Sequence, residues 1–225
     1  MTKNSTLPIV YLISGSAPAW RVLLALEVKG VDYQTHVLQT SQKEQKQDWF
    51  LAINPRGQIP VFKDGAQVVT ESLAIMHYID AKHPQYKIFG ESPDQVAQIE
   101  QSCHELLSYT DKAITAFVQP VFRNKLDDVF GNLPDIGNVI MQELSICESS
   151  LAKHGFLAGD KLSAADIVMI PTMQRLKRAV SKAPDAAREA GLDQIQTEFS
   201  VLQNWTRMTE NTAEFEKTYP EHWKS

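Results

Sequence analysis

NPRGQIPVFKDGAQVVTESLAIMHYI, residues 54–79, contains the pattern that decides the fold of the first part of this chain. Two short apolar runs flank Asp64 and Gly65, and this dipeptide is a strong signal for a tight turn between antiparallel strands. The segment that follows, ESLAIMHYIDAKHP, has the spacing of an amphipathic helix that ends before Pro84. The stretch therefore predicts a β-hairpin followed by a helix.

A strand, a helix and a second strand are expected upstream of this hairpin. The apolar run LPIVYLI at residues 7–13 has the composition of a buried strand. Apolar residues then recur at helical spacing up to Gly30, a natural helix C-terminus, and another strand is expected near residues 33–38. The order βαβ and then ββα predicts a small mixed α/β domain over residues 1–84.

Strand signals stop after this first domain. Residues 85–93 read as a linker, and residues 94–225 as successive amphipathic helices. Within them, Ser163 and Asp166 have the spacing of a capping box, in which each residue satisfies a free donor at the start of a helix. The sequence predicts a second, all-helical domain over residues 94–225.

Composition narrows the classes of function. The chain has 225 residues, 43% of them hydrophobic, with a formal net charge of -5. The absence of a basic run argues against nucleic-acid binding, and no apolar run approaches the roughly 18 residues that a membrane span requires. Cys103 and Cys147 lie in helical patterns and are expected to be reduced core thiols, and no histidine has metal-site spacing. We expect a cytoplasmic protein without a metal.

Motifs from both predicted domains together resemble one family. NPRGQIPVFKDG, ESLAIMHYI and FLAGDKLSAADIVMIP occur in the order and separation typical of the cytosolic glutathione transferases. The resemblance covers nearly the whole chain. It implies a thioredoxin-like N-terminal domain, an all-helical C-terminal domain that forms the pocket for a hydrophobic electrophile, glutathione as co-substrate, and a homodimer.

Several residues of the first motifs are expected to bind glutathione. The bond between Ile59 and Pro60 is a candidate cis peptide, which would turn the backbone groups of Ile59 outward to pair with a peptide ligand. The alternative is a trans proline that begins an edge strand. Glu71 and Ser72 open a helix whose free N–H groups favour a carboxylate, although Ser72 could simply be a helix cap. Gln58 matches the family's polar residue before the Ile-Pro pair.

Two residues of the preceding polar loop are weaker candidates. Gln45 and Lys46 match, by spacing, positions from which several classes of the family contact the glycine carboxylate of glutathione. The loop is rich in lysine and glutamine. An ordinary solvated surface therefore remains an alternative reading.

The corner between the first strand and the first helix is the expected thiolate site. SAPAWRV, residues 16–22, resembles the SSCSWRV segment of the zeta class, and this places Ser16 where a hydroxyl donates to the thiolate of glutathione. Residues 17–19 depart from that pattern and contain no cysteine, which argues against thiol-disulfide chemistry. Ser14 and Tyr11 are rival donors, Tyr11 being more typical of the core. A plain helix cap is the alternative role for Ser16.

The second substrate is expected to contact the helical domain. The candidate residues for this pocket are Tyr109, Phe117, Phe122, Met173 and Arg178. Residues at helical spacing often belong to the core instead. One specific argument favours Arg178, because its separation from Pro171 in the sequence resembles that of a substrate-binding arginine in the zeta class.

Three functions remain open on the sequence alone. The first is conjugation of the glutathione thiolate to an electrophilic small molecule, as in detoxification. The second is a glutathione-dependent cis–trans isomerase of the maleylacetoacetate type. The third is a binding module with this fold and no catalysis, since a fold does not by itself determine a function.

Overall fold

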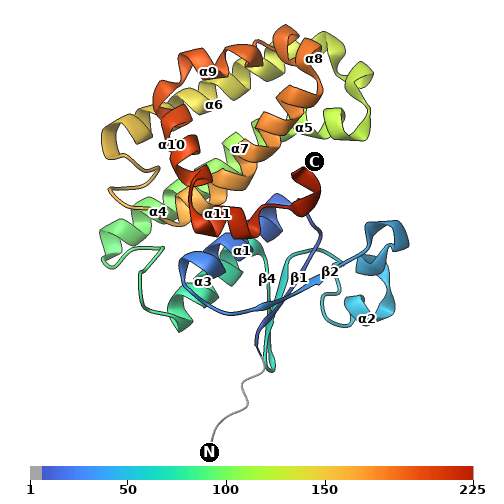
Figure 1. The fold of residues 1–225 in the computed structure, drawn as a ribbon, viewed down its shortest axis with the longest axis vertical. Helices are drawn as coiled ribbons and strands as arrows, with labels where there is room; N and C mark the ends of the chain where they lie inside the picture. The colour runs from blue at the N-terminus through green and yellow to red at the C-terminus, as the bar shows by residue number, and fades with distance from the viewer. Residues whose placement is uncertain (1–6, 225) are drawn as a thin grey trace, which may run out of the picture. The chain divides into compact units, whose positions relative to one another are not determined.

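A four-stranded sheet organises the first compact unit of the computed structural model, which describes residues 7–224 (Figure 1). Residues 1–6 and 225, which we included in the predicted domains, lie outside the described residues. The strands are β1 (Ile9–Leu12), β2 (Gln34–Val37), β3 (Val61–Asp64) and β4 (Gln67–Thr70), in the spatial order β2-β1-β3-β4. β1 pairs parallel with β2 and antiparallel with β3, and β3 pairs antiparallel with β4. The predicted hairpin and mixed sheet are confirmed.

Helices cover both faces of this sheet. Because side chains alternate along a strand, Val10 and Leu12 point to one face and Tyr11 to the other. On the first face they pack in a core cluster with residues of α1 (Ala17–Val28) and α3 (Ser72–Lys82). On the second face Tyr11 packs with Phe50 of the short helix α2 (Asp48–Leu51). The layered arrangement is that of a thioredoxin-like domain.

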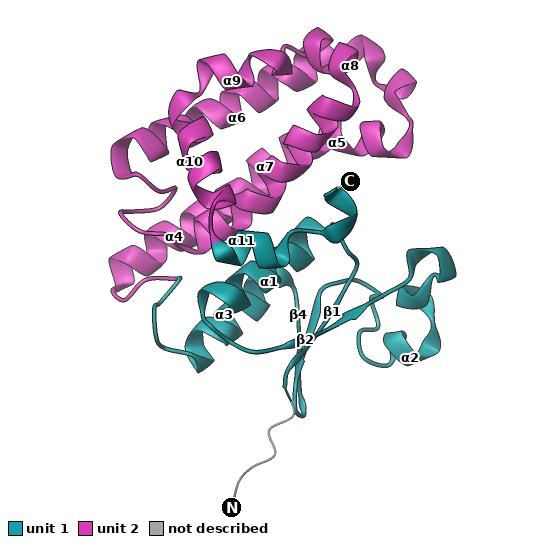
Figure 2. Cartoon of the chain, in the orientation of Figure 1, with its two compact units in different colours: residues 1–88, 213–225 teal, residues 89–212 magenta. Residues whose placement is uncertain are grey.

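The C-terminal segment belongs to this same unit. The compact units comprise residues 1–88 with 213–225, and residues 89–212 (Figure 2). Trp20 of α1 donates a hydrogen bond from Nε1 to Oγ1 of Thr218, at 2.8 Å, in α11 (Ala213–Thr218). This division differs from the predicted domains, which assigned the whole of 94–225 to the helical domain, because the tail has apolar partners on α1.

The aromatic rings of the tail explain this attachment. Trp20 is only 2% exposed, and its ring contacts those of Phe215, Tyr219 and Trp223 at centroid distances of 5.5 to 5.6 Å. Trp223 lies in a short 3-10 turn at residues Glu221–Trp223. Aromatic pairs at such distances contribute more than their buried area alone. The tail therefore packs against α1 through these rings.

The second unit consists of helices. They are α4 (Pro93–Glu105), α5 (Asp111–Arg123), α6 (Leu133–His154), α7 (Ala164–Lys182), α8 (Pro184–Glu189), α9 (Ile195–Glu198) and α10 (Ser200–Glu210). A single π-helical turn, Leu106–Thr110, joins α4 to α5. The predicted all-helical character is confirmed.

The predicted capping box is present at the start of α7. Asp166 is fully buried, and its Oδ2 accepts hydrogen bonds from the backbone N–H and the hydroxyl of Ser163, both at 3.0 Å. Its Oδ1 accepts from the Leu157 N–H at 3.1 Å and from Trp205 Nε1 at 2.9 Å. Asp166 therefore ties the loop before α7 to α10.

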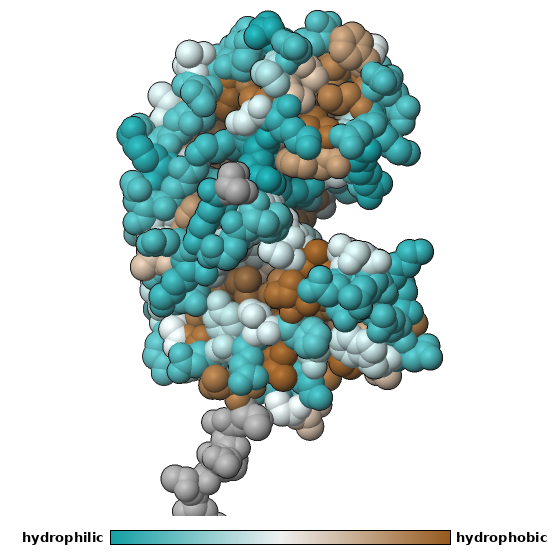
Figure 3. Space-filling view, turned by 45° about the vertical axis from the view of Figure 1, so that its right-hand side comes forward, coloured by the Kyte–Doolittle hydropathy of each residue, from teal (hydrophilic) through white to brown (hydrophobic). Residues whose placement is uncertain are grey.

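Among residues 7–224, none of the helices is both long and apolar enough to cross a bilayer. The face drawn in Figure 3 is largely hydrophilic, with smaller apolar areas between the polar residues.

Candidate active site

Strand pairing brings the predicted glutathione-binding segments to one edge of the sheet. Tyr11 pairs with Val61, so the start of β3 lies beside the end of β1. Val61 also pairs with Thr70, so the end of β4 lies on the other side of β3. The corner after β1, the Ile-Pro pair before β3 and the helix start after β4 consequently share this edge.

Ser16 lies at the start of α1, and its hydroxyl has no hydrogen-bond partner among the described residues. It is the N-cap residue of the helix, yet its side chain forms no capping hydrogen bond. Within residues 7–224 the hydroxyl forms no other hydrogen bond. Pro18 lies in the first turn, where its missing N–H costs the helix nothing. A half-buried hydroxyl beside the free N–H groups of a helix N-terminus is suited to meet an anion.

Ser14, the rival donor, has a partner from the far end of the chain. Its Oγ lies 3.1 Å from Nδ1 of His222. Gly15 between the two serines has φ of +80°, and a Cβ there would lie 3.0 Å from the Trp223 ring. The C-terminal residues therefore cover the corner, a contribution that our sequence reading missed because nothing local in the sequence signals it.

The other rival, Tyr11, belongs to the core. It is 8% exposed, and its ring lies against those of Phe50, His36 and Trp49. This position agrees with the core role that its strand pattern suggested.

The bond between Ile59 and Pro60 is cis, as expected. In the part of the chain that the structure describes, neither the N–H nor the C=O of Ile59 forms a backbone hydrogen bond. The turn before it is held by buried Asn54, whose Nδ2 donates to the Gln58 carbonyl at 2.8 Å. Asn54 is a structural residue that our sequence reading did not single out. Ile59 thus offers an unpaired donor and acceptor to an extended ligand.

Glu71, rather than Ser72, is the N-cap of α3. Glu71 has φ of +68°, a left-handed backbone conformation that is uncommon for a non-glycine residue. Ser72 is the first residue of the helix. Strained conformations of this kind persist where surrounding structure enforces them, and they cluster at binding sites. The free N–H groups of this helix start face the edge described above.

Gln45 and Lys46 lie beside the Ile-Pro turn through contact with Gly57. Lys46 Nζ donates to the carbonyls of Arg56 at 3.3 Å and Gly57 at 3.4 Å. Gln45 Oε1 is buried and has no hydrogen-bond partner among the described residues. A buried acceptor without a partner is unusual, and a bound donor would satisfy it.

The residues predicted for the second substrate do not line one cavity, although Arg178 and Phe122 are in contact. Phe117 is fully buried in the core of its unit, whereas Tyr109 is 61% exposed beside a cavity of about 270 Å³. Arg178 stacks over the ring of Phe122, with Cζ 5.3 Å from the ring centroid. Met173 lies elsewhere in this unit. Helix packing, which the sequence pattern does not specify, separates these side chains.

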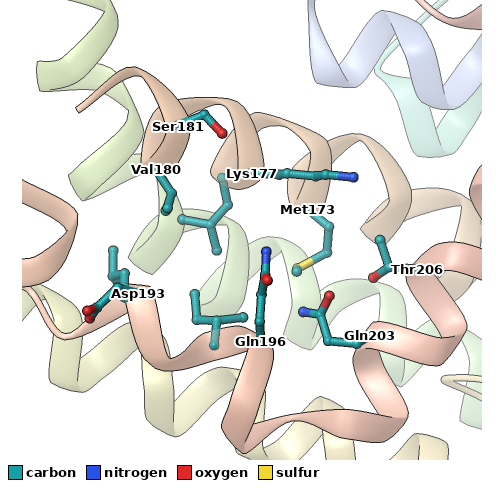
Figure 4. Close-up of a pocket in the computed structure, with 11 residues that line it drawn as sticks. Met173, Lys177, Val180, Ser181, Asp193, Gln196, Gln203 and Thr206 are labelled. Atoms are coloured by element: carbon teal, nitrogen blue, oxygen red, sulfur yellow. The ribbon is translucent and has the colours of Figure 1, made fainter. Parts of the chain in front are cut away.

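Met173 lines a cavity of about 140 Å³ between α7, α9 and α10 (Figure 4). Apolar and polar side chains both line it: α7 contributes Met173, Lys177, Val180 and Ser181, and Gln196, Gln203 and Thr206 lie on the opposite side (Figure 4). No group of residues 7–224 combines three or more histidine, cysteine, aspartate or glutamate side chains that could hold a metal ion. Arg178 and Phe122 do not line this cavity.

Comparison with known proteins agrees with this geometry. Residues 8–81 match the family model described as glutathione S-transferase, N-terminal domain, and residues 138–211 match the glutathione S-transferase C-terminal domain. Glutathione S-transferase F10 of Arabidopsis thaliana is 32% identical over 74% of this chain and 80% of its own length. A probable maleylacetoacetate isomerase 1 of Drosophila melanogaster is 28% identical over 77% of this chain and 71% of its own length.

A solved structure extends the similarity to nearly the whole chain. The crystal structure of a glutathione S-transferase from the Antarctic clam Laternula elliptica has a TM-score of 0.81 and 29% identity, and covers 98% of this chain and 95% of that chain. A thioredoxin-like unit followed by an all-helical unit is the architecture of this class of enzyme. The chain belongs to the glutathione S-transferase family, and it is a glutathione transferase.

Proposed function

We propose that Ser16 holds glutathione as its thiolate and that this thiolate attacks an electrophilic carbon of an apolar small molecule. The observation that supports this proposal is the uncommitted hydroxyl of Ser16 at the N-terminus of α1. Ser14 is the less suitable donor, because its hydroxyl already lies against the His222 imidazole.

Such a donor would greatly raise the fraction of glutathione that is thiolate at neutral pH. A free thiol has a pKa of about 8.5, so roughly 3% of it is thiolate at pH 7. If one hydrogen bond and the helix N-terminus lowered that pKa to about 6.5, roughly three quarters would be thiolate. Serine acts here as a hydrogen-bond donor and not as a base, since its own pKa is far too high. The nucleophile is the sulfur of the substrate.

The remaining edge residues would bind the rest of glutathione. The unpaired N–H and C=O of Ile59 support strand-like pairing with the peptide backbone of the ligand, beside Pro60 and Gln58. The start of α3 at Glu71 and Ser72 suits the γ-glutamyl carboxylate.

The loop residues Gln45 and Lys46 would meet the other end of glutathione. The unsatisfied acceptor of Gln45 and the cation of Lys46 suit the glycine portion. Both lie against Gly57 and thus beside the turn that presents Ile59.

The test compares wild type with Ser16→Ala, using Ser108→Ala, at an exposed serine of the helical unit, as the matched control. Glutathione binding is measured by calorimetry, thiolate by its ultraviolet absorbance, and conjugation with a chlorodinitrobenzene. We expect Ser16→Ala to bind glutathione within a few fold of wild type, while its thiolate absorbance at pH 7 falls by up to about 20-fold, towards the roughly 3% of a free thiol. Its kcat should fall by about 100-fold, a typical loss for one donor to a developing anion. Equal thiolate in Ser16→Ala and wild type would contradict this role.

A second activity is supported by relatives and by the sequence position of one arginine. The distance of Arg178 from Pro171 resembles that of a substrate-binding arginine of the zeta class, and relatives include proteins named as probable maleylacetoacetate isomerases. In that reaction glutathione adds to a cis double bond, rotation follows, and glutathione leaves unchanged. We expect Arg178→Leu to lower turnover of maleylacetoacetate more than turnover of a chlorodinitrobenzene, which has no carboxylate. Wild-type protein without any maleylacetoacetate turnover would exclude this second activity.

The assembly and location follow the family. We expect a homodimer in the cytoplasm. Sedimentation velocity of the full chain tests the dimer, and fractionation of cells that express it tests the location.

A further inference from the structure

The imidazole of His222 lies at the corner where the proposed function places the glutathione sulfur. Its Nδ1 is 3.1 Å from Ser14 Oγ, although the two residues are 208 positions apart in the sequence. A Cβ on Gly15 would lie 3.2 Å from the imidazole Cε1. The ring therefore lies directly over the backbone between Ser14 and Ser16.

Aromatic contacts hold the segment that carries this imidazole. The rings of Trp20, Tyr219 and Trp223 contact one another at 5.6 to 5.9 Å, and the buried Thr218 hydroxyl accepts from Trp20. The His222 ring itself lies 5.9 Å from that of Trp223. A ring fixed by aromatic packing can act at a defined position, which is what proton transfer requires.

We propose that Ser14 and His222 form a relay that accepts the thiol proton of glutathione. The S–H bond breaks and its proton joins Ser14 Oγ, while the original hydroxyl proton passes from Ser14 to Nδ1 of His222. The products are a thiolate, a neutral Ser14 and a protonated imidazole. This inference rests on the proposed function, because it needs the sulfur at the corner. It gives separate roles to the two serines: Ser16 donates to the thiolate, and Ser14 carries the proton away.

The charges around the corner suit this transfer. In water an imidazole and a thiol differ by about two pK units, so the transfer needs support. The donor Ser16, the N-terminus of α1 and the attraction between thiolate and imidazolium all supply it. Residues 13–19, which include the Ser14 and Gly15 contacts of His222, carry no charged side chain. Among the described residues of its own segment, Glu221 and Lys224 are charged, and they pair with each other at 2.6 Å.

The test counts protons. Glutathione is titrated calorimetrically into the full chain near pH 7.5, in phosphate and in Tris, whose ionisation enthalpies differ, and the difference gives the protons released to the buffer. S-methylglutathione, which has no thiol proton, corrects for other groups. The variants are His222→Gln, which keeps hydrogen-bonding capacity but cannot accept a proton, and Ser14→Ala, which leaves the tail unchanged. His104→Gln, at a side chain that is 70% exposed in the helical unit, is the control.

We expect wild type, His104→Gln and Ser14→Ala to form thiolate while releasing little of its proton, and His222→Gln to release about one more proton for each thiolate formed, because the final acceptor is lost only there. The apparent pKa of the bound thiol should also rise by about one unit in His222→Gln, because no imidazolium forms. In Ser14→Ala the acceptor remains and the carrier is lost, so stopped-flow absorbance should show thiolate forming more slowly than in wild type. A full proton released by wild type, equal release in wild type and His222→Gln, or equal rates of thiolate formation in wild type and Ser14→Ala, would overturn the relay and leave the role of Ser16 intact. Failure of wild type to bind glutathione at millimolar concentration would overturn the proposed function itself.

Discussion

Gly57 is expected to be the most sensitive glycine at the edge of the sheet where we propose that glutathione binds. Its φ is +60°, and a Cβ there would lie 2.5 Å from the backbone oxygen of Gln45 and 2.8 Å from Lys46 Nζ. Gly65, in the β3–β4 turn, has the same φ of +60° but nothing within 4 Å of the added atom. Replacing each by alanine separates backbone strain from steric conflict.

The expected losses of stability follow from backbone strain and steric conflict. A left-handed conformation costs an alanine about 1–2 kcal/mol, and this cost applies to Gly57→Ala and Gly65→Ala alike. Only Gly57→Ala adds overpacking, worth about 1–3 kcal/mol, because a backbone carbonyl cannot swing away as a side chain can. We therefore expect the free energy of unfolding to fall by about 2 kcal/mol more for Gly57→Ala than for Gly65→Ala.

The functional consequence is also specific. Relief of the conflict at Gly57 must move the turn that carries Gln45 and Lys46. Calorimetry should then show glutathione bound about ten-fold more weakly by Gly57→Ala and unchanged by Gly65→Ala, and urea unfolding followed by circular dichroism measures the stabilities. Equal losses of stability in the two variants, or unchanged glutathione affinity in Gly57→Ala, would refute this reasoning.

Other predictions concern buried and charged groups. Asp166→Ala should lower the free energy of unfolding by about 3–5 kcal/mol, because buried backbone and indole donors lose their acceptor; urea unfolding measures it, and a loss below about 1 kcal/mol would contradict the predicted role. Burial raises the pKa of Cys147 to about 12, so neither it nor the buried Cys103 should react with Ellman's reagent at pH 8 until denaturant is added; rapid native reaction would show an accessible thiol. Burial raises the pKa of Asp64, but the hydrogen bonds from Lys82 and Tyr78 and the nearby positive charges together outweigh it and hold the pKa below its usual value. The pair should therefore stabilise the fold above the ordinary aspartate pKa and lose this effect as pH falls, so Asp64→Asn should match wild type in acid and be less stable at pH 7.

Much of the fold could be predicted because its signals are local. The Asp64–Gly65 turn, the start of α7 at Ser163 and Asp166, and the Ile59–Pro60 pair each occupy a few consecutive residues. The antiparallel pairing of β1, β3 and β4 then follows from a hairpin and a short sheet. Contacts within these elements are enough to bring together the edge of the sheet where we propose that glutathione binds.

The second-substrate residues illustrate what could not be predicted. Phe117 and Phe122 lie on one helix, yet the first is fully buried and the second is 38% exposed. Helical spacing gives both the same apolar character. Only the packing of α5 against its neighbours decides which side chain is available.

By itself, the sequence determined the order of strands and helices, since short-range patterns encode it, and its resemblance to a family implied the thioredoxin-like unit and the segments expected to bind glutathione. Only the tertiary structure decided that the C-terminal residues join that unit and bring His222 to Ser14. That contact spans 208 residues. It depends on the aromatic packing of the tail along α1, which no local periodicity encodes.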